Sequence, residues 1–425
     1  MAVCYFNQDY SKRFDCEYVI KKNIFNVFIE YDINKEIEPI NECIFTGGNT
    51  NFENRDILIV DSENKKNYLL KDSYYVGHTN RFGTPDELFR TTFQSRFFFI
   101  SNDYEKLCNL LQTPKVNEIK IFSKDIITLF GTPSLSTIDN ADEYILNFKR
   151  DKHKSSININ SNYIKKIAIG DSWKSVRDSK NHMINIDLCG YIELELTKKI
   201  NYDAVYDFVY ELVLFMQLYH PDKFIIEKIQ VTVDKNSYEL CLPIYEIELN
   251  ESYMRASIHG TILDHLAKCY NSIPYRNSKT EIRNIPYIIL NTSRGLEDNF
   301  LMFYRFIECY YKKQSIPNIR KSFISYSIKT NYKKKNISDD EVEQYSQEII
   351  CLRNHYVHAG YYIKNESLRI SFDRINRKKN PKENTANNVD VDWIYNKTKI
   401  LYEIAVDIIF SNMLNYDTYN FDRHF

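Results

Sequence analysis

The chain has 425 residues, enough for two or three domains, and its 43% hydrophobic and 27% charged residues are ordinary for a globular protein. Nine scattered cysteines without a Cys-x-x-Cys pair argue against a disulfide framework and a thiolate zinc site, and they indicate a reducing compartment. The start has no signal-peptide core, and the longest apolar stretch, at 204–219, contains charged residues and is too short to cross a bilayer. We therefore expect a cytoplasmic protein without a membrane partner.

The first 250 residues predict a β-rich region, with a possible break into two subdomains near residue 160. The strand candidates before that break are 18–33, 56–60, 67–70, 93–100 and 118–122. The second and third of these are expected to pair as a hairpin across the polar turn SENKK. The segment GHTNRFG at 77–83 is interpreted as a loop, and it lacks the Lys-Ser/Thr ending of a phosphate-binding loop.

Beyond residue 160 the pattern mixes strands with one clear helix. Strand-like runs at 167–169 and 183–196 are followed by a helix at 202–220, which Pro221 stops. Two more strand candidates follow at 224–233 and 238–246. The end of the β-rich region is expected between about 247 and 285.

Residues 285–425 predict a helical domain. Helices are expected at 296–313, 317–330, 338–360 and 393–414, and four helices around one core make a bundle. The predicted fold class is therefore α+β, with a β-rich N-terminal region followed by a C-terminal all-α bundle. Although the formal net charge of the chain is −1, residues 275–425 hold 24 Lys and Arg against 18 Asp and Glu. This mildly basic balance is compatible with a nucleic-acid partner.

The helix at 338–360 has clear start and stop signals. Ser338 and Glu341 form a capping-box pattern at its beginning, and Gly360 stands where a helix C-cap is expected. Between these ends the apolar side chains recur at alternating spacings of three and four, which predicts one buried stripe: Val342, Tyr345, Ile349, Leu352 and Tyr356.

The opposite side of this helix carries an unusual set of side chains. At about 100° per residue, Asn354 and His358 lie one turn apart and face away from the buried stripe, and Arg353 flanks them. The apolar residues Ile350 and Val357 share this outer side. We interpret it as a second surface, covered by a partner or by substrate.

Arg353, Asn354 and His358 resemble the Arg-x(4–6)-His motif of HEPN domains, small all-α domains that often act as metal-independent ribonucleases. In that family the residue after the arginine is typically polar, with asparagine the usual choice. The order of a β-rich N-terminal region and a C-terminal helical domain is similar to that of the ApeA-like group of bacterial anti-phage proteins. The resemblance implies that 285–425 is a HEPN domain and that 1–250 senses infection or restrains the nuclease.

The three motif residues have the chemistry that metal-independent RNA cleavage needs, because RNA carries its own nucleophile in the 2′-hydroxyl. A histidine titrates near neutral pH and can move a proton, and an arginine can stabilise charge on phosphate oxygens. Asn354 can hold His358 or the phosphate by hydrogen bonds. Two proton transfers are easier with two motifs facing each other across a dimer axis, and paired motifs are usual in the family.

Further residues have candidate supporting roles. In the ApeA-like group the helix at 296–313 tends to carry a glutamate, and Glu308 is the matching residue, which could orient an arginine or histidine of the motif or lie at the boundary of the core. His355 lies at the rim of the buried stripe, where packing is the favoured role. Two basic loops could follow an RNA backbone or simply be solvated: Lys333, Lys334 and Lys335, and Arg377, Lys378 and Lys379.

The sequence therefore predicts a metal-independent HEPN endoribonuclease without a cofactor, acting as a homodimer in anti-phage abortive infection. By resemblance its substrate is RNA, with tRNA the expected target, and a phage-derived molecule is a possible trigger. The alternative is a non-catalytic HEPN module that binds RNA or protein. A metal-dependent nuclease is a third interpretation, which the lack of an acidic cluster with ligand spacing disfavours.

Overall fold

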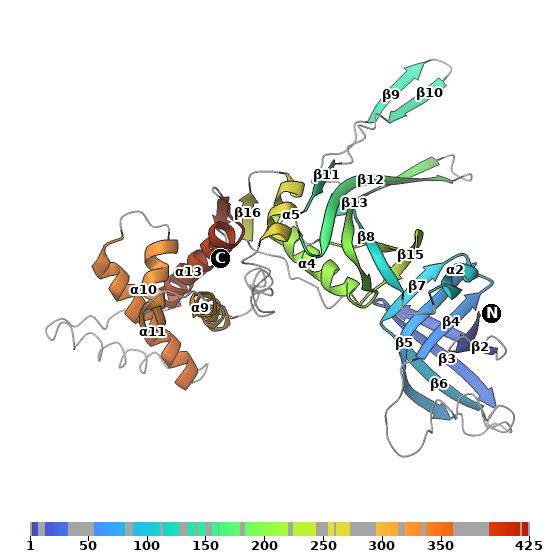
Figure 1. Cartoon of the computed structure of the whole chain (residues 1–425), viewed down its shortest axis with the longest axis horizontal. Helices are drawn as coiled ribbons and strands as arrows, with labels where there is room; N and C mark the ends of the chain where they lie inside the picture. Colours follow the sequence, from blue (N-terminus) through green and yellow to red (C-terminus); the bar gives the residue numbers. More distant parts are fainter. Residues whose placement is uncertain are drawn as a thin grey trace. The chain divides into compact units, whose positions relative to one another are not determined.

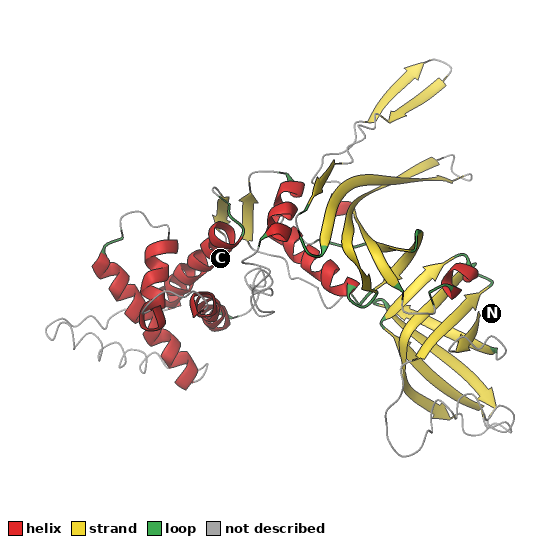
Figure 2. Cartoon of the chain, viewed as in Figure 1, coloured by secondary structure: helices red, strands yellow, loops and turns green. Residues whose placement is uncertain are grey.

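The structure of the chain is a computed structural model (Figure 1). Most strands lie in the N-terminal part of the chain and most helices in its C-terminal half, so the predicted α+β class is confirmed (Figure 2). The structure describes residues 2–6, 13–32, 55–80, 88–110, 114–126, 135–140, 143–148, 155–159, 161–178, 183–219, 224–243, 254–258, 261–272, 295–312, 319–332, 337–359, 391–416 and 419–423. The chain divides into a β unit, Met1–Val213 with Phe224–Glu248, and a helical unit, Leu214–Lys223 with Leu249–Phe425.

The described part of the β unit is built on one antiparallel sheet with the strand order β11-β12-β13-β8-β14-β15-β7-β5-β4-β1-β2-β3-β6. The strands in chain order are β1 (Ala2–Phe6), β2 (Phe14–Lys21), β3 (Ile24–Asp32), β4 (Arg55–Asp61), β5 (Lys66–Asn80), β6 (Leu88–Ser95), β7 (Phe97–Ser101), β8 (Lys115–Ser123), β11 (Ser155–Asn158), β12 (Ile164–Asp178), β13 (Met183–Asn201), β14 (Lys228–Val233) and β15 (Asn236–Cys241). A separate hairpin joins β9 (Leu135–Asn140) to β10 (Glu143–Phe148), and a short helix α2 spans Tyr104–Cys108. The strands β11 and β12, on either side of the predicted break near residue 160, pair with each other.

A two-residue turn divides the run at 18–33, which the sequence predicted as one strand. Lys22 and Asn23 both have positive φ, at 50° and 56°, and Lys21 pairs with Ile24 across them. Such a turn matches the right-handed twist of the strands that it joins. Asparagine tolerates positive φ but lysine does not signal it, so the residue pattern did not indicate a turn here.

The long strand β5 bends at one place and pairs with different strands on either side of the bend. The predicted pairing of 56–60 with 67–70 is confirmed as β4 with β5. On its other edge, β5 pairs first with β7 and then, beyond the bend at Asp72 (φ 51°), with β6. The Ser95 hydroxyl donates to the carbonyl of Lys71 at 2.8 Å at this bend. The predicted strand 93–100 is therefore two strands, which end and begin on either side of Arg96.

The interpretation of 77–83 as a loop is wrong for its first four residues. Gly77–Asn80 belong to β5 and pair with β6, while 81–83 lie outside the described residues. The register shifts between Tyr75 and Gly77, and a glycine inside a strand often marks such a bulge rather than a loop.

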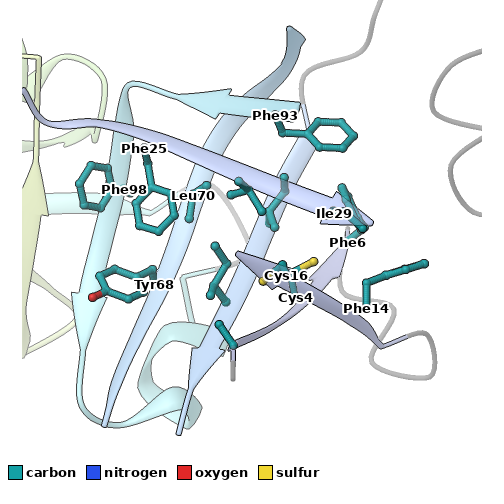
Figure 3. Packing of buried hydrophobic residues seen from close by; sticks show 14 residues of the cluster. Cys4, Phe6, Phe14, Cys16, Phe25, Ile29, Tyr68, Leu70, Phe93 and Phe98 are labelled. Carbon is teal, nitrogen blue, oxygen red and sulfur yellow. The ribbon is translucent and has the colours of Figure 1, made fainter. Parts of the chain in front are cut away.

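Six strands close into a barrel, because β6 pairs with β3 on one edge and with the second half of β5 on the other. The alternation of side chains in these strands directs one set inward, and Phe25, Val27 and Ile29 of β3 are fully buried. Figure 3 shows this core, where aromatic rings lie beside the thiols of Cys4 and Cys16. Phe25 contacts the rings of Tyr68 and Phe98, each at 5.1 Å between centroids.

The rest of the sheet is dominated by the long hairpin of β12 and β13. Gly170 on β12 lies under the Tyr191 ring of β13, and a Cβ atom at Gly170 would lie 2.5 Å from the Tyr191 hydroxyl oxygen. Lys120 Nζ lies 3.6 Å from the centroid of the same ring. The predicted helix at 202–220 is confirmed as α4 (Val205–Tyr219), in which the division between the two units falls. Nowhere in the described ranges is a helix both long enough and apolar enough to cross a membrane.

The helical unit contains the four predicted helices, and each is confirmed within a few residues. They are α9 (Leu296–Lys312), α10 (Ile319–Asn331), α11 (Asp339–Ala359) and α13 (Val391–Asp407), the last continuing as a π-helix η2 (Ile408–Met413). Aromatic rings join α9 to its neighbours, with Phe303 against Tyr402 of α13 at 5.5 Å between centroids. These helices form one bundle, and α9 packs against the other three.

Three further elements of the helical unit had no clear sequence signal: β16 (Met254–Ile258), α5 (Ile262–Asn271) and β17 (Tyr419–Arg423). Strands β16 and β17 pair with each other, and α5 begins with a capping box of Thr261 and Asp264. The buried His265 of α5 contacts the carbonyl of Phe215 through Nε2 at 2.7 Å and the Tyr416 hydroxyl through Nδ1. This histidine therefore joins segments that are distant in the sequence.

Candidate functional site

The helix α11 positions the candidate site, and its predicted start is confirmed. The Ser338 backbone N–H donates to the Glu341 carboxylate at 2.9 Å, and the Glu341 N–H donates to the Ser338 hydroxyl at 3.2 Å. The helix ends at Ala359, so the Arg-Asn-His motif occupies its last two turns, and Gly360 lies outside the described residues.

The predicted buried stripe of α11 is confirmed for four of its five members, and Tyr345 is half-buried. Ser346 is also buried beside this stripe, where its hydroxyl donates to the Val342 carbonyl at 2.6 Å and accepts from Ser325 of α10 at 2.8 Å. Packing of the stripe against α9, α10 and α13 fixes the rotation of α11 and thereby the side on which the motif residues lie.

Arg353 is half-buried and has an unusual set of neighbours. Its guanidinium donates to Asn354 Oδ1 at 3.1 Å, and its Cζ lies 5.8 Å from the centroid of the Tyr304 ring of α9. Among the residues that the structure describes, no carboxylate lies within ion-pair distance of this guanidinium. A guanidinium has five N–H donors and a permanent positive charge. Because Asn354 accepts from only one of these donors, Arg353 has further donors for an added anion.

Asn354 is exposed, as the helical wheel predicted, and its side-chain oxygen is the acceptor for Arg353. This bond leaves the amide N–H groups of Asn354 as donors for another partner. The backbones of His355 and His358 lie in the last turns of α11, but their side chains are outside the described part of the structure. The two basic loops, 333–335 and 377–379, also lie outside the described residues.

Glu308 lies at the edge of the α9 core and forms an ion pair with Lys312, one turn further on, at 2.8 Å. Burial raises the pKa of the Tyr304 hydroxyl, the Glu308 charge raises it further, and the Arg353 charge lowers it. Both charges are thus close enough to act on Tyr304. The prediction that Glu308 orients an arginine or a histidine remains untested, since its only described ion pair is with Lys312.

The outer side of α11 carries an apolar surface beside the motif. Val357 is 45% exposed, and Ile350 is half-buried about two turns earlier. We name these two residues the α11 apolar patch. An exposed valine alone is common, but here it adjoins Arg353 and Asn354 on one helix face.

Two features near the site were not predicted from the sequence. Tyr304 lies in the predicted helix at 296–313, and nothing in its place in the sequence indicates that its ring faces Arg353. The second is a buried ion pair between Lys397 of α13 and Glu348 of α11, with Lys397 Nζ 4.2 Å from the centroid of the Tyr345 ring. Long-range pairs of this kind leave no local pattern in the sequence.

The site can hold an anion through Arg353 and offers hydrogen-bonding groups from Asn354. Within the described ranges, no three side chains of His, Cys, Asp or Glu are grouped so as to hold a metal ion.

The chain was compared with models of protein families, with characterised proteins and with solved structures, and none of them matches it.

Proposed function

We propose that the chain is a metal-independent endoribonuclease of the HEPN type, with its active site at the end of α11. The observation that carries this proposal is Arg353, a half-buried arginine whose guanidinium has no carboxylate partner among the described residues. A half-buried cation is costly without a counter-charge, and a phosphate group of RNA would supply one.

In the proposed reaction the 2′-hydroxyl of RNA attacks the adjacent phosphorus, and the 5′-oxygen leaves with a proton, which yields a 2′,3′-cyclic phosphate. Arg353 would stabilise the charge that develops on the phosphate oxygens, because a guanidinium is a cation with paired N–H donors that match those oxygens. His358 would transfer a proton to or from the reacting oxygens. Asn354, hydrogen-bonded to Arg353 at 3.1 Å, would hold the guanidinium or the phosphate in place.

A homodimer would supply two copies of the motif to one reaction, and the α11 apolar patch supports this arrangement. Pairing of two such patches across a two-fold axis would cover Val357 and bring the neighbouring Arg353 residues together. Val357→Asp is expected to convert the dimer to a monomer in light scattering and to abolish cleavage. A wild-type chain that is monomeric at micromolar concentration would remove the shared site from the proposal.

The substrate and the biological setting rest on the resemblance to the ApeA-like group. We propose that tRNA is cleaved in the cytoplasm during abortive infection and that the β unit restrains the nuclease until a phage-derived trigger is present. The mildly basic balance of residues 275–425 supports an RNA partner for the helical unit.

The test is RNA cleavage in excess EDTA, with total RNA and purified tRNA, with and without extract from phage-infected cells. Arg353→Ala and His358→Ala are expected to abolish cleavage, whereas Arg305→Ala, which removes an exposed arginine from α9, is expected to keep it. Products with 2′,3′-cyclic phosphate ends would support the proposed chemistry. Cleavage that EDTA abolishes, or that survives in both motif variants, would contradict it.

A second candidate function is a non-catalytic module that binds RNA or another protein. The exposed Val357 favours it, because an apolar side chain on an outer helix face is a common feature of protein interfaces. Wild-type protein that binds RNA or a partner but cleaves no RNA in infected extract would support this function over the first.

A further inference from the structure

We propose that Tyr304 is the positioning residue for Arg353, holding the guanidinium over its ring so that the arginine faces the substrate phosphate. This inference rests on the proposed function, since it assigns Arg353 to the reaction. It adds an aromatic residue of α9 to a motif whose three residues all lie on α11.

The geometry of the two side chains carries the inference. Arg353 Cζ lies 5.8 Å from the centroid of the Tyr304 ring, within the distance of about 6 Å over which a cation is attracted to an aromatic face. The other described contact of the guanidinium is Asn354 on the same helix, one residue along the chain. Tyr304 therefore supplies the contact from a second helix, and it is the contact that can fix the direction of the long arginine side chain.

The Tyr304 ring is itself closely packed. It is 6% exposed, it packs edge-on against Phe323 of α10 at 5.4 Å between centroids, and it stacks on Phe300 of α9 at 6.5 Å. Phe300 in turn packs against Tyr356 of α11 at 5.4 Å. Rings of α9 and α10 thus contact Tyr304 directly and a ring of α11 packs against Phe300, and such close packing suits a support for a side chain with many rotamers.

A guanidinium that is supported by an aromatic ring can still bind a phosphate, whereas one that is paired with a carboxylate is already occupied. A carboxylate partner would occupy two N–H donors and cancel the positive charge, whereas a ring face contacts the guanidinium plane and leaves its N–H groups at the edge free. Glu308, the nearby acidic residue of α9, is engaged by Lys312 at 2.8 Å. The described contacts therefore support Arg353 without a carboxylate that would neutralise it.

The kinetic test compares Tyr304→Phe, which keeps the ring, with Tyr304→Leu, which removes it. Tyr304→Phe is expected to cleave RNA at the wild-type rate, and Tyr304→Leu to lower kcat by roughly 5- to 30-fold with KM little changed. Phe306→Leu is the matched control, because it removes an equally buried ring from the same helix. A loss of kcat in Phe306→Leu equal to that in Tyr304→Leu, or a loss in Tyr304→Phe, would overturn the proposal.

A second readout does not depend on catalysis. The Nε–Hε signal of Arg353, assigned by its loss in Arg353→Lys, should carry the ring-current shift of Tyr304 in NMR spectra of the full chain. Tyr304→Phe should keep this shift, and Tyr304→Leu should remove it. An unchanged Arg353 signal in Tyr304→Leu would refute the positioning role whether or not the protein cleaves RNA, whereas a shifted signal with no RNA cleavage would confirm the contact and refute only the proposed function.

Discussion

Replacement of Lys397 by methionine should destabilise the helical unit more than any other single lysine change in the described part of that unit. Lys397 is 7% exposed in its side chain and pairs with Glu348, which is 15% exposed, so the pair joins α13 to α11 in a poorly solvated place. The Lys397 ammonium also lies 4.2 Å from the Tyr345 ring centroid and 5.3 Å from that of Trp393. Methionine keeps the apolar length of the side chain but removes the charge.

The cost follows from the group that is left behind. Removal of one partner of a buried ion pair leaves an uncompensated charge and typically costs about 3–5 kcal/mol. Glu348 retains a hydrogen bond from Gln344 at 3.0 Å and some exposure to water, so we expect the lower end, about 3 kcal/mol. With a urea dependence of about 2 kcal/mol per molar, the unfolding midpoint should fall by about 1.5 M.

The assay uses the two tryptophans of the chain, of which Trp393 lies in α13 and Trp173 in β12. In a Trp173→Phe background, fluorescence reports the unfolding of the bundle alone. Lys399→Met is the matched control on the same helix and should change the stability by less than about 0.5 kcal/mol. The double variant Lys397→Met with Glu348→Met should be more stable than Lys397→Met alone, because no bare charge remains. The reasoning would be refuted if Lys397→Met had the same urea midpoint as Lys399→Met. It would also be refuted if the loss of stability in the double variant equalled the sum of the losses in Lys397→Met and Glu348→Met.

Three smaller predictions concern other parts of the chain. Burial lowers the pKa of His265 to about 4, so between pH 6.5 and 4 this histidine takes up a proton only in the unfolded chain. The free energy of unfolding should therefore fall by about 3 kcal/mol as the pH is lowered through this window. Urea titrations at several pH values should show that His265→Gln removes this part of the pH dependence. Gly170→Ala should cost about 1–3 kcal/mol, because the new methyl meets the Tyr191 hydroxyl, and adding Tyr191→Ser should recover most of the loss in thermal unfolding. Ser338→Ala should lower the free energy of unfolding by about 1 kcal/mol in urea titrations, because it removes the hydroxyl that accepts a hydrogen bond from the Glu341 N–H at the start of α11. Ser338→Asp should keep this cap. A decrease below about 0.3 kcal/mol in the alanine variant would contradict the capping role.

The helices were predictable because their signals are local. The capping box of Ser338 with Glu341 and the apolar spacing of α11 lie within one helix, and both are confirmed. The strands were found as runs of apolar residues, but their division depended on backbone angles that the sequence signals weakly. The turn at Lys22 and Asn23 and the bend at Asp72 all have positive φ at residues other than glycine, whereas Gly77 lies within a strand.

The candidate site was predictable in its residue types and its helix face, but not in its surroundings. Asn354 is exposed on the outer side of α11 and Arg353 flanks it, half-buried, as the wheel indicates. The ring that faces Arg353 comes from α9, and the pairing of α9 with α11 depends on the packing of the whole bundle. A side chain such as Tyr304, which belongs to an apolar stripe, gives no sign in the sequence that it also supports a cation.

A half-buried arginine without a carboxylate partner among the described residues should respond to added anions, and this response can be measured apart from catalysis. In the part of the bundle that the structure describes, the Arg353 charge is held by the Tyr304 ring and the Asn354 side-chain oxygen, which compensate a guanidinium less fully than a carboxylate would. An anion that binds Arg353 should therefore stabilise the folded chain by mass action, so RNA that cannot be cleaved, with 2′-deoxy sugars, should raise the melting temperature of the bundle. The increase should vanish in Arg353→Ala and shrink in Tyr304→Leu, whereas Arg305→Ala should retain it. If the melting temperature rose equally in the wild-type protein and in the three variants, the RNA would bind elsewhere on the chain. The charge of Arg353 would then have no part in substrate binding.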